Sequence, residues 1–203
     1  MKKTLDEHAS RFDDIAGEYD DTQNDTDEYR ASVSLVVEHA NPGPEDTVVD
    51  LGTGTGAIAL ALAEDAGTVV GRDISEGMMD RAREKAAEQG FENVEFGEGR
   101  FRDPGVESAD VVVSNFAMHH LSDEEKVEAI EAIAELGPRK FVLGDVMFFG
   151  TPDPDEPFYS PEVDDPSTVG HLADALTDAG FALTAVERVH EQVGVLVAER
   201  GEE

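Results

Sequence analysis

Two spacings of apolar residues alternate along this chain, and together they predict a layered α/β fold. Short, almost continuous apolar runs predict strands, at 47–51, 68–72, 93–97, 109–114 and 140–146. Between them, apolar residues recur every three or four positions and predict helices, at 56–65, 76–89 and 123–136. Strands that alternate with helices through short connections are typical of a parallel sheet covered on both faces.

Residues that begin and end helices support this prediction. Ser122-Asp123-Glu124-Glu125 reads as a capping box, in which the serine and the last glutamate bind each other's backbone N–H groups. Ser75 is expected to cap the helix that follows it, and Gly90 to end that helix. Nearer the N-terminus, helical spacing predicts a short amphipathic helix around 12–19 and a second helix over 27–40.

A proline-rich stretch, 151–166, interrupts the alternation. Five of the nine prolines fall there, so the stretch cannot be a helix or a central strand. Long loops in compact domains tend to be functional or disordered, and two readings stay open: a lid over the mouth of an active site, or an inert surface insertion. A helix at 167–179 and strands near 181–190 and 193–199 follow, and the two strands predict an antiparallel pair.

We therefore expect one domain over residues 1–203, with a Rossmann-like, doubly wound sheet. The sheet should have seven strands, mostly parallel, with an antiparallel terminal strand. The expected parts are an N-terminal helical lid segment, a cofactor-binding core, the proline-rich loop, and a C-terminal helix with its strand pair, at 1–45, 46–146, 151–166 and 167–199.

The charge of the chain concerns its surface and its partners. It has 47 acidic and 15 basic residues, for a net charge of −32. Abundant carboxylates are typical of proteins adapted to high salt, and an acidic field that steers a cationic substrate is the alternative. Binding to nucleic acid needs clustered lysine and arginine, so nucleic acid is not an expected partner.

The absence of cysteine excludes disulfides, thiolate metal sites and a thiol nucleophile. The first residues, 1–7, become acidic at once and contain no apolar segment, so we expect no signal peptide. No apolar run reaches the roughly 18 residues of a membrane span, so no membrane partner is expected. These features predict a cytoplasmic protein.

The residues best suited to bind a ligand lie where the first predicted strand ends. The run Thr47–Leu51 leads into Gly52, Gly54 and Gly56, and a helical pattern follows. A glycine turn before a helix N-terminus directs backbone N–H groups outward, and glycine lets a ligand approach the backbone closely. Asp73, about 20 positions later at the end of the next strand, is the expected partner of a ribose diol. The spacing predicts an adenosine-containing ligand.

Two kinds of adenosine ligand fit this turn. The spacing Gly52-x-Gly54-x-x-Ala57 also satisfies the fingerprint of dinucleotide binders. Asp50, however, lies directly beneath the turn, where a carboxylate would repel a pyrophosphate and suit a ligand with an ammonium and a sulfonium group. The residues therefore favour S-adenosylmethionine over a nicotinamide or flavin dinucleotide. A glycine-rich turn that binds nothing is the third alternative.

The segment Asp50–Gly56 (DLGTGTG) resembles the first motif of the class I S-adenosylmethionine-dependent methyltransferases. Three further segments, in order and at matching separations, resemble the ubiquinone/menaquinone-methyltransferase-like branch: Phe12–Asp20, Val70–Met79 and Asp110–Leu121. With Asp123–Lys126 after them, the match looks closest to the small YrrT-like group. The resemblance covers 12–199 and implies transfer of a methyl group from S-adenosylmethionine to a small-molecule acceptor.

The same resemblance implies a set of cofactor-binding residues, namely Asp50, Gly52, Gly54, Gly56, Asp73, Ile74, Met78 and Asn115. The three glycines would let the turn pack against the amino-acid half and sulfonium of the cofactor, and Asp50 would hold the turn and favour the ligand's positive charge. Asp73 would accept both ribose hydroxyls. Ile74 and Met78 would flank the adenine, and Asn115 would face the methyl group and the substrate.

One position departs from the family pattern. The family usually has Gly-Asp after the third strand, and that carboxylate accepts the adenine amino group. Here the residues are Gly99 and Arg100, and arginine cannot accept a hydrogen bond. The contact is therefore lost, or it comes from Glu98, Asp103 or the backbone. Arg100 either stacks on the adenine or points to solvent.

Other polar residues are harder to assign. His119 and His120 follow a predicted strand, where adjacent side chains point in opposite directions, so they are poor joint metal ligands and we expect no metal. The alternatives are a structural role for His120 beneath the site and a role for either histidine as a base. Asp145 and Met147 are expected at the mouth of the pocket. Tyr19 is either part of a lid or an ordinary helix aromatic.

Two other functions stay open. A dinucleotide-dependent oxidoreductase would need a second substrate domain or a catalytic Tyr/Lys pair, and the chain leaves no length for one. A non-catalytic protein that binds S-adenosylmethionine or S-adenosylhomocysteine is the other, and Arg100 gives it weight. Methyl transfer demands little of side chains, because the sulfonium is already activated. The sequence therefore leaves the catalytic residues unknown. A homodimer is one assembly that the sequence allows.

Overall fold

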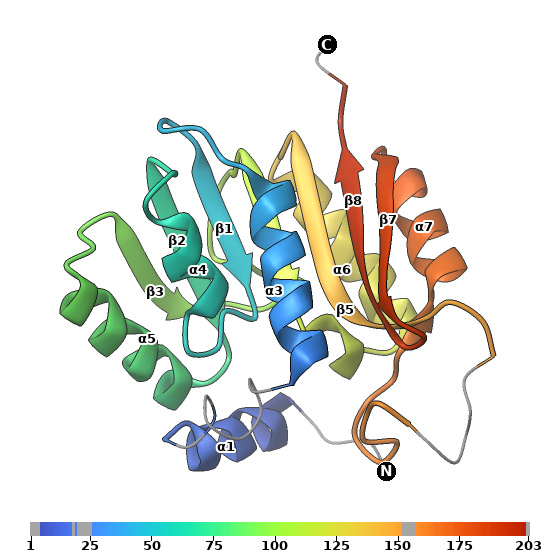
Figure 1. Ribbon diagram of the computed structural model, residues 1–203, viewed down its shortest axis with the longest axis horizontal. Coiled ribbons are helices and arrows are strands. Elements are labelled where there is room, and N and C mark those ends of the chain that lie inside the picture. The colour runs from blue at the N-terminus through green and yellow to red at the C-terminus, as the bar shows by residue number, and fades with distance from the viewer. Residues whose placement is uncertain (1–4, 18, 20–25, 152–156, 202–203) are drawn as a thin grey trace.

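The computed structural model of this protein describes residues 5–17, 19, 26–151 and 157–201 (Figure 1). Two expectations from the sequence fall partly outside these ranges. The segment Phe12–Asp20 contains two residues outside the description, and the proline-rich loop contains five, 152–156.

A single sheet forms the centre of the fold, and seven of its strands follow one another in the order β3-β2-β1-β4-β5-β8-β7. Their bounds in that order are Val94–Glu98, Thr68–Asp73, Thr47–Leu51, Val111–Asn115, Lys140–Phe148, Val193–Glu199 and Ala182–His190. The pairings from β3 through β5 are parallel, and β8 is antiparallel to both of its neighbours. The predicted sheet is therefore confirmed. A short strand, β6 (Ser167–Thr168), adds an eighth member beside the end of β5, where a helix was expected to begin.

Helices cover both faces of this sheet. α3 (Asp27–Ala40) and α4 (Ala57–Leu62) lie on one face, and α6 (Asp123–Glu135) and α7 (Val169–Asp178) lie on the other (Figure 1). Side chains of β1 alternate between the two layers, so that Val48 joins the cluster beneath α3 and α4, and Val49 joins the opposite one. Because both faces are covered, the inner strands are apolar almost throughout.

The predicted helix ends are confirmed. The hydroxyl of Ser75 accepts a hydrogen bond from the backbone N–H of Met78, and α5 (Glu76–Gln89) ends at Gly90 with a φ of 76°. Ser122 and Glu125 form the reciprocal capping box at the start of α6. α5 packs on β2 and β3 and so reaches the edge of the sheet.

The N-terminal segment 1–45, expected as a lid, divides into two parts with different positions. α3 belongs to a sheet layer, since Val36 and Ala40 are completely buried. α1 (Leu5–Ile15) lies instead at the end of the sheet toward which the arrows of β1 and β3 point (Figure 1). Its Asp13 carboxylate accepts hydrogen bonds from the Ser75 hydroxyl (2.6 Å) and the Gly77 N–H (2.9 Å) at the start of α5. α3 is therefore part of a sheet layer, and α1 is the described helix of this segment that lies at the strand ends.

A search of the described helices for a long apolar segment found none that could cross a membrane.

Candidate active site

A cleft of about 830 Å³ opens at the carboxyl ends of the parallel strands. Strand order reverses between β1 and β4, and open α/β sheets bind their ligands at such a point. Of the residues predicted to bind a cofactor, seven line this cleft: Asp50, Gly52, Gly54, Asp73, Ile74, Met78 and Asn115. Gly56 does not line it.

The glycine turn has the backbone that the sequence predicted, with positive φ at all three glycines. A methyl group on Gly52 would overlap the Cβ of Ala117, so this glycine is required by packing. A methyl group on Gly54 would meet no atom within 4 Å, because it would stand in the cleft. A methyl group on Gly56 would crowd Ala82 of α5 and Phe96 of β3, so packing requires this glycine, and its predicted contact with the cofactor stays a prediction.

Hydrogen bonds fasten this turn to β2. The N–H groups of Gly52 and Thr53 both donate to the carbonyl of Arg72, at 2.8 and 3.0 Å. The N–H of Gly54 donates to Asp73 Oδ2 (2.8 Å), and the N–H of Ser75 donates to Asp73 Oδ1 (3.0 Å). Burial raises the pKa of Asp73, although these N–H groups favour its carboxylate form. Asp73 therefore joins the turn to the start of α5 and keeps one lone pair on each oxygen for a ligand.

Asp50 is the most unusual charge in the cleft. It is 1% exposed, and its Oδ2 accepts a hydrogen bond from the Thr53 hydroxyl (2.7 Å). Its Oδ1 is buried without a hydrogen-bond partner in the part of the chain that the structure describes. Burial raises the pKa of this carboxyl to about 7. The Thr53 hydroxyl opposes the rise because it favours the anion, and so does the backbone N–H of Ala59, which makes no hydrogen bond to Oδ1. The wall of the cleft thus contains a buried carboxylate oxygen that no described residue hydrogen-bonds.

Arg100 lines the cleft together with Glu98 and Asp103. Backbone hydrogen bonds join Arg100 and Asp103 in a tight bridge, with N···O distances of 2.9 and 3.0 Å. The arginine side chain is half-exposed, and its Nη2 lies 3.9 Å from Glu98 Oε1. The residues that could contact the adenine in place of the family's aspartate therefore lie at the same rim of the cleft.

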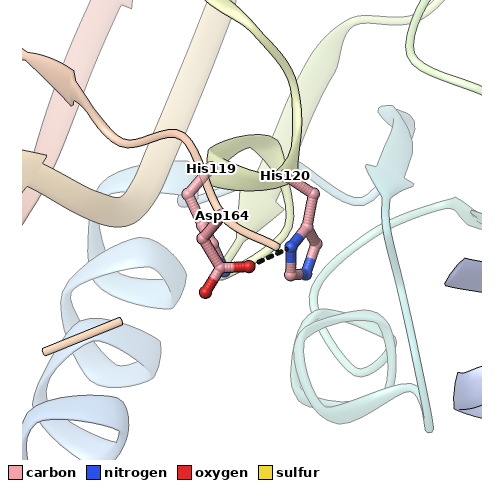
Figure 2. A group of neighbouring side chains, drawn as sticks. All are labelled: His119, His120 and Asp164. Carbon is pink, nitrogen blue, oxygen red and sulfur yellow. Dashed lines mark hydrogen bonds and ion pairs between the residues drawn. The ribbon is translucent and has the colours of Figure 1, made fainter. Parts of the chain in front are cut away.

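The expected opposite orientation of His119 and His120 is wrong. Both belong to η1 (Met118–His120), one turn of 3₁₀ helix after β4, and their ring centroids lie 4.1 Å apart. Figure 2 shows the contact between the Asp164 carboxylate and the His120 ring. Its Oδ1 is 2.7 Å from His120 Nδ1 and 4.0 Å from His119 Nε2. The prediction failed because it treated the pair as an extension of the strand, whereas the chain turns immediately after β4.

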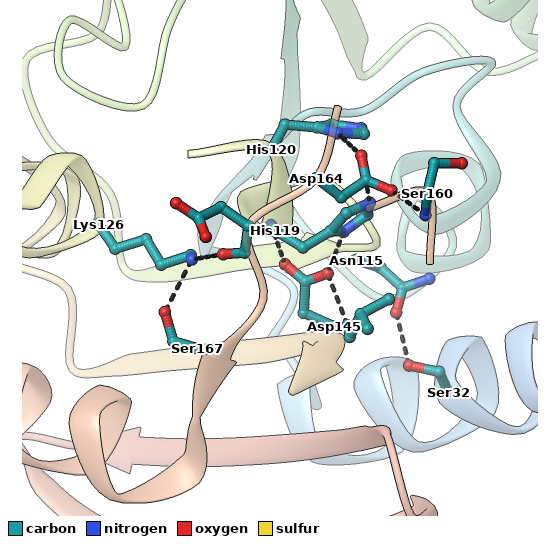
Figure 3. A network of polar contacts seen from close by, with 11 residues as sticks. Ser32, Asn115, His119, His120, Lys126, Asp145, Ser160, Asp164 and Ser167 are labelled. Carbon is teal, nitrogen blue, oxygen red and sulfur yellow. Dashed lines mark hydrogen bonds and ion pairs between the residues drawn. The ribbon is translucent and has the colours of Figure 1, made fainter. Parts of the chain in front are cut away.

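Asp145 and Met147 are buried, at 2% and 0% exposure, so the prediction that they lie at the mouth of the pocket is wrong. β5 continues to Phe148, past the point where it was expected to end, and keeps both side chains inside the protein. Asp145 Oδ1 lies 2.5 Å from His119 Nδ1, and its Oδ2 accepts the His119 N–H at 2.9 Å (Figure 3). Burial opposes a charge on His119, yet Asp145 outweighs it and raises the pKa of this imidazole.

Asn115, at the end of β4, is held by α3. The Ser32 hydroxyl donates to Asn115 Oδ1 at 2.6 Å (Figure 3). A side chain at position 144 would overlap both polar groups, which explains the glycine there. Asn115 Nδ2 is buried without a partner among the described residues, and Asn115 is one of the residues that line the cleft.

Aromatic side chains that the sequence did not single out form a wall of the cleft. Phe116 has a φ of 52°, which is rare for a residue other than glycine, and its ring contacts those of Tyr29 and Phe158. His8 and Phe12 of α1 line the same cleft, together with Tyr19. The sequence analysis expected a lid from residues 1–45 and named Tyr19 as a candidate, but it did not single out His8, Tyr29 or Phe116.

Comparison with known proteins agrees with this geometry. A family model for a methyltransferase domain matches residues 48–137. An uncharacterized methyltransferase of Bacillus pumilus (strain SAFR-032) is 33% identical over 148 residues, which cover 70% of this chain and 68% of that protein.

Solved structures agree on the fold. The DhpI–SAH complex superposes with a TM-score of 0.74 and 21% identity, over 98% of both chains. The [4+2]-cyclase SpnF superposes with a TM-score of 0.82 and 15% identity, over 100% of this chain and 98% of that chain. These identities are too low to carry a reaction from one protein to another, because one fold can serve different functions. On the sequence matches, the chain belongs to the methyltransferase domain family.

Proposed function

We propose that this protein transfers a methyl group from S-adenosylmethionine to a small-molecule acceptor. The observation that carries the proposal is the buried carboxylate of Asp50, which lines the cleft and has an unpartnered oxygen. A dinucleotide would bring a pyrophosphate against this oxygen, and S-adenosylmethionine would bring an ammonium and a sulfonium. Family membership supports the same reaction.

The residues of the cleft fit this cofactor part by part. Gly54 leaves open space above the turn, where the amino-acid half of the ligand would lie. Asp73 retains an acceptor lone pair on each oxygen for the two ribose hydroxyls. Ile74 and Met78 line the cleft beyond Asp73 and would flank the adenine. Asn115 presents its free amide N–H groups and would face the methyl group and the acceptor.

S-adenosylmethionine, when bound, supplies an activated methyl group as the electrophile. The protein then has to orient the acceptor and to keep water from the reacting atoms. Tyr29 and Phe116, together with Phe12 of α1, give the cleft an aromatic lining that is suited to an acceptor with an apolar body. We infer that α1 acts as the lid of this cleft, whereas the proline-rich loop stays a second candidate.

Finer assignments rest on sequence patterns alone. The order of the four motifs supports the ubiquinone/menaquinone-methyltransferase-like branch and its YrrT-like group. The net charge of −32 supports a protein that works in high salt, and the composition supports a cytoplasmic location. A homodimer is compatible with the proposal.

Calorimetry in molar KCl tests the cofactor. We expect S-adenosylmethionine and S-adenosylhomocysteine each to bind at one site, and NAD not to bind. Binding of NAD in preference to S-adenosylhomocysteine would refute the proposal. A second measurement, incubation with a labelled methyl donor and a metabolite extract, separates the enzyme from a non-catalytic binding protein. We expect label to appear in a small molecule, and tight cofactor binding without any transfer would favour the binding protein.

A further inference from the structure

Three metal-binding side chains meet beside the cleft and are not needed for the cofactor. His119 and His120 come from η1, and Asp164 comes from the loop that precedes β6 (Figure 2). One ligand atom from each residue lies within 4.8 Å of the other two. His119 and Asp164 are buried, at 7% and 8% exposure, so this is not a surface cluster of acids.

Outer contacts already hold these side chains in position. Asp145 binds His119 Nδ1, which leaves His119 Nε2 directed toward Asp164 (Figure 3). The backbone N–H of Ser160 donates to Asp164 Oδ2 at 2.8 Å, which leaves Oδ1 directed toward the histidines. Metal-binding histidines commonly have their second ring nitrogen bound to a carboxylate in this way, because the contact fixes the tautomer and the ring orientation.

The loop that carries Asp164 is itself fastened to η1. The N–H of Asp165 donates to the carbonyl of His119 at 2.7 Å. The buried ammonium of Lys126 binds the carbonyl of Asp165 and the hydroxyl of Ser167 (Figure 3). Two carboxylates, Asp145 and Asp164, thus face the histidines, and Lys126 is the nearby opposing cation.

We propose that His119, His120 and Asp164 form a binding site for one divalent transition-metal ion of the zinc type. Two imidazole nitrogens and one carboxylate are a known catalytic zinc set, which keeps a fourth position open. His120 lines the cleft, so that position opens toward the bound acceptor. The site would offer the acceptor's oxygen, nitrogen or sulfur a place to bind the metal.

The distances allow the ion with small movements. Tetrahedral bonds of about 2.0–2.1 Å separate neighbouring ligand atoms by about 3.3 Å. Asp164 Oδ1 lies 2.7 Å from His120 Nδ1 and 4.0 Å from His119 Nε2, on either side of that value. The ligand atoms of the two histidines lie within the same 4.8 Å limit, so shifts of at most about 1.5 Å would bring all three atoms to bonding distance. Such shifts are within the ordinary freedom of these rotamers.

Cobalt(II) is the probe that tests the site, because it distinguishes this donor set from the acidic surface. Cobalt bound to surface carboxylates is six-coordinate and absorbs visible light weakly, whereas a four- or five-coordinate histidine site absorbs strongly. Chelator-treated protein in molar KCl is titrated with CoCl₂. We expect one equivalent to produce the strong visible band, and ZnCl₂ to remove it by displacement.

Variants assign the band to these residues. His119→Gln and His120→Gln should abolish it, and Asp145→Asn should weaken cobalt affinity by about 10- to 100-fold, the scale of an outer-contact loss. His171→Gln is the matched control, since His171 also lies near a carboxylate, with Nε2 3.8 Å from Asp123 Oδ1, but has no part in the cluster. It should leave the band unchanged. Far-ultraviolet circular dichroism checks that each variant is folded. If His119→Gln unfolds, His120→Gln still tests the metal site, because His120 is the most exposed of the three proposed ligands.

A wild-type titration without the strong band, or a band that persists in His120→Gln, would overturn the metal site. S-adenosylhomocysteine binding is measured on the same samples. Cofactor binding does not depend on the three proposed metal ligands. If only the metal proposal is wrong, S-adenosylhomocysteine still binds. If the proposed function is wrong, S-adenosylhomocysteine binds neither the wild type nor any variant.

Discussion

Replacement of Asp50 by asparagine should make the protein more stable and bind its cofactor less well. The carboxylate is 1% exposed and has one hydrogen bond from Thr53, and its Oδ1 has none within the described residues. Asparagine has nearly the same shape, keeps an oxygen for the Thr53 hydroxyl and removes the charge. The variant therefore isolates the cost of burying this charge from the packing of the turn.

The size of the effect follows from the pKa. Burial raises the pKa of Asp50 from 3.8 to about 7. The native protein then binds this proton more tightly than the unfolded chain, so stability falls as the pH rises from about 4 to about 7 and is constant above that range. A shift of about three units, at about 1.36 kcal/mol each, costs on the order of 4 kcal/mol once both states are ionised. The asparagine variant should recover up to that amount.

Urea unfolding in molar KCl measures this difference. At about pH 8 we expect Asp50→Asn to have the larger free energy of unfolding, and the gap should close as the pH falls toward about 4. The comparison is made between wild type and variant at each pH, because Asp73 also has a raised pKa and contributes to both profiles. S-adenosylhomocysteine binding should weaken by about 10- to 150-fold, the loss of one charged hydrogen bond of about 1.5–3 kcal/mol. A variant that is less stable at the higher pH, or one that binds the ligand normally, would refute the reasoning.

Three further predictions concern the turn, the ribose contact and the surface. Gly52→Ala should lower the free energy of unfolding by roughly 2–5 kcal/mol, since it adds overlap with Ala117 to a left-handed backbone. Gly54→Ala should lower it by only about 1–2 kcal/mol and yet block cofactor binding. Urea unfolding measures the stabilities and calorimetry the binding, and a Gly54→Ala variant less stable than Gly52→Ala would contradict this prediction. Asp73→Ala should weaken S-adenosylhomocysteine binding by about 1.5–3 kcal/mol, whereas His120→Ala should leave it nearly intact, and calorimetry giving the opposite ranking would show that these roles are misassigned. The melting temperature should rise steeply between dilute buffer and molar KCl, because salt screens the repulsion of a chain with a net charge of −32; a flat response in scanning calorimetry would count against adaptation to high salt.

The sequence was sufficient for the architecture and for the glycine turn. Strand and helix periods, the caps at Ser75 and Ser122, and the glycines at 52–56 report on backbone geometry within a few residues. Short-range sterics and local hydrogen bonds control that geometry, so the sequence shows it directly. The family motifs also predicted that Asp50 and Asp73 line one cleft, because the carboxyl ends of neighbouring parallel strands share an edge of the sheet.

The surroundings of that turn could not be predicted in the same way. Asp164 is one of many acidic residues in a proline-rich stretch, and nothing in its neighbours shows that it lies between two histidines 44 and 45 positions earlier. Likewise, the burial of Asp145 depends on how far β5 continues and on what covers its end.

Local sequence therefore determined the strands, the helices and the glycine turn that we propose as the cofactor site. Tertiary structure alone decided that α1 lies over the cleft, that His119 and His120 face the same carboxylate, and that Asp50 keeps an oxygen without a partner. The physical reason is that side-chain neighbours far apart in the sequence are set by packing of the whole sheet and its helices, which no short window of the chain encodes.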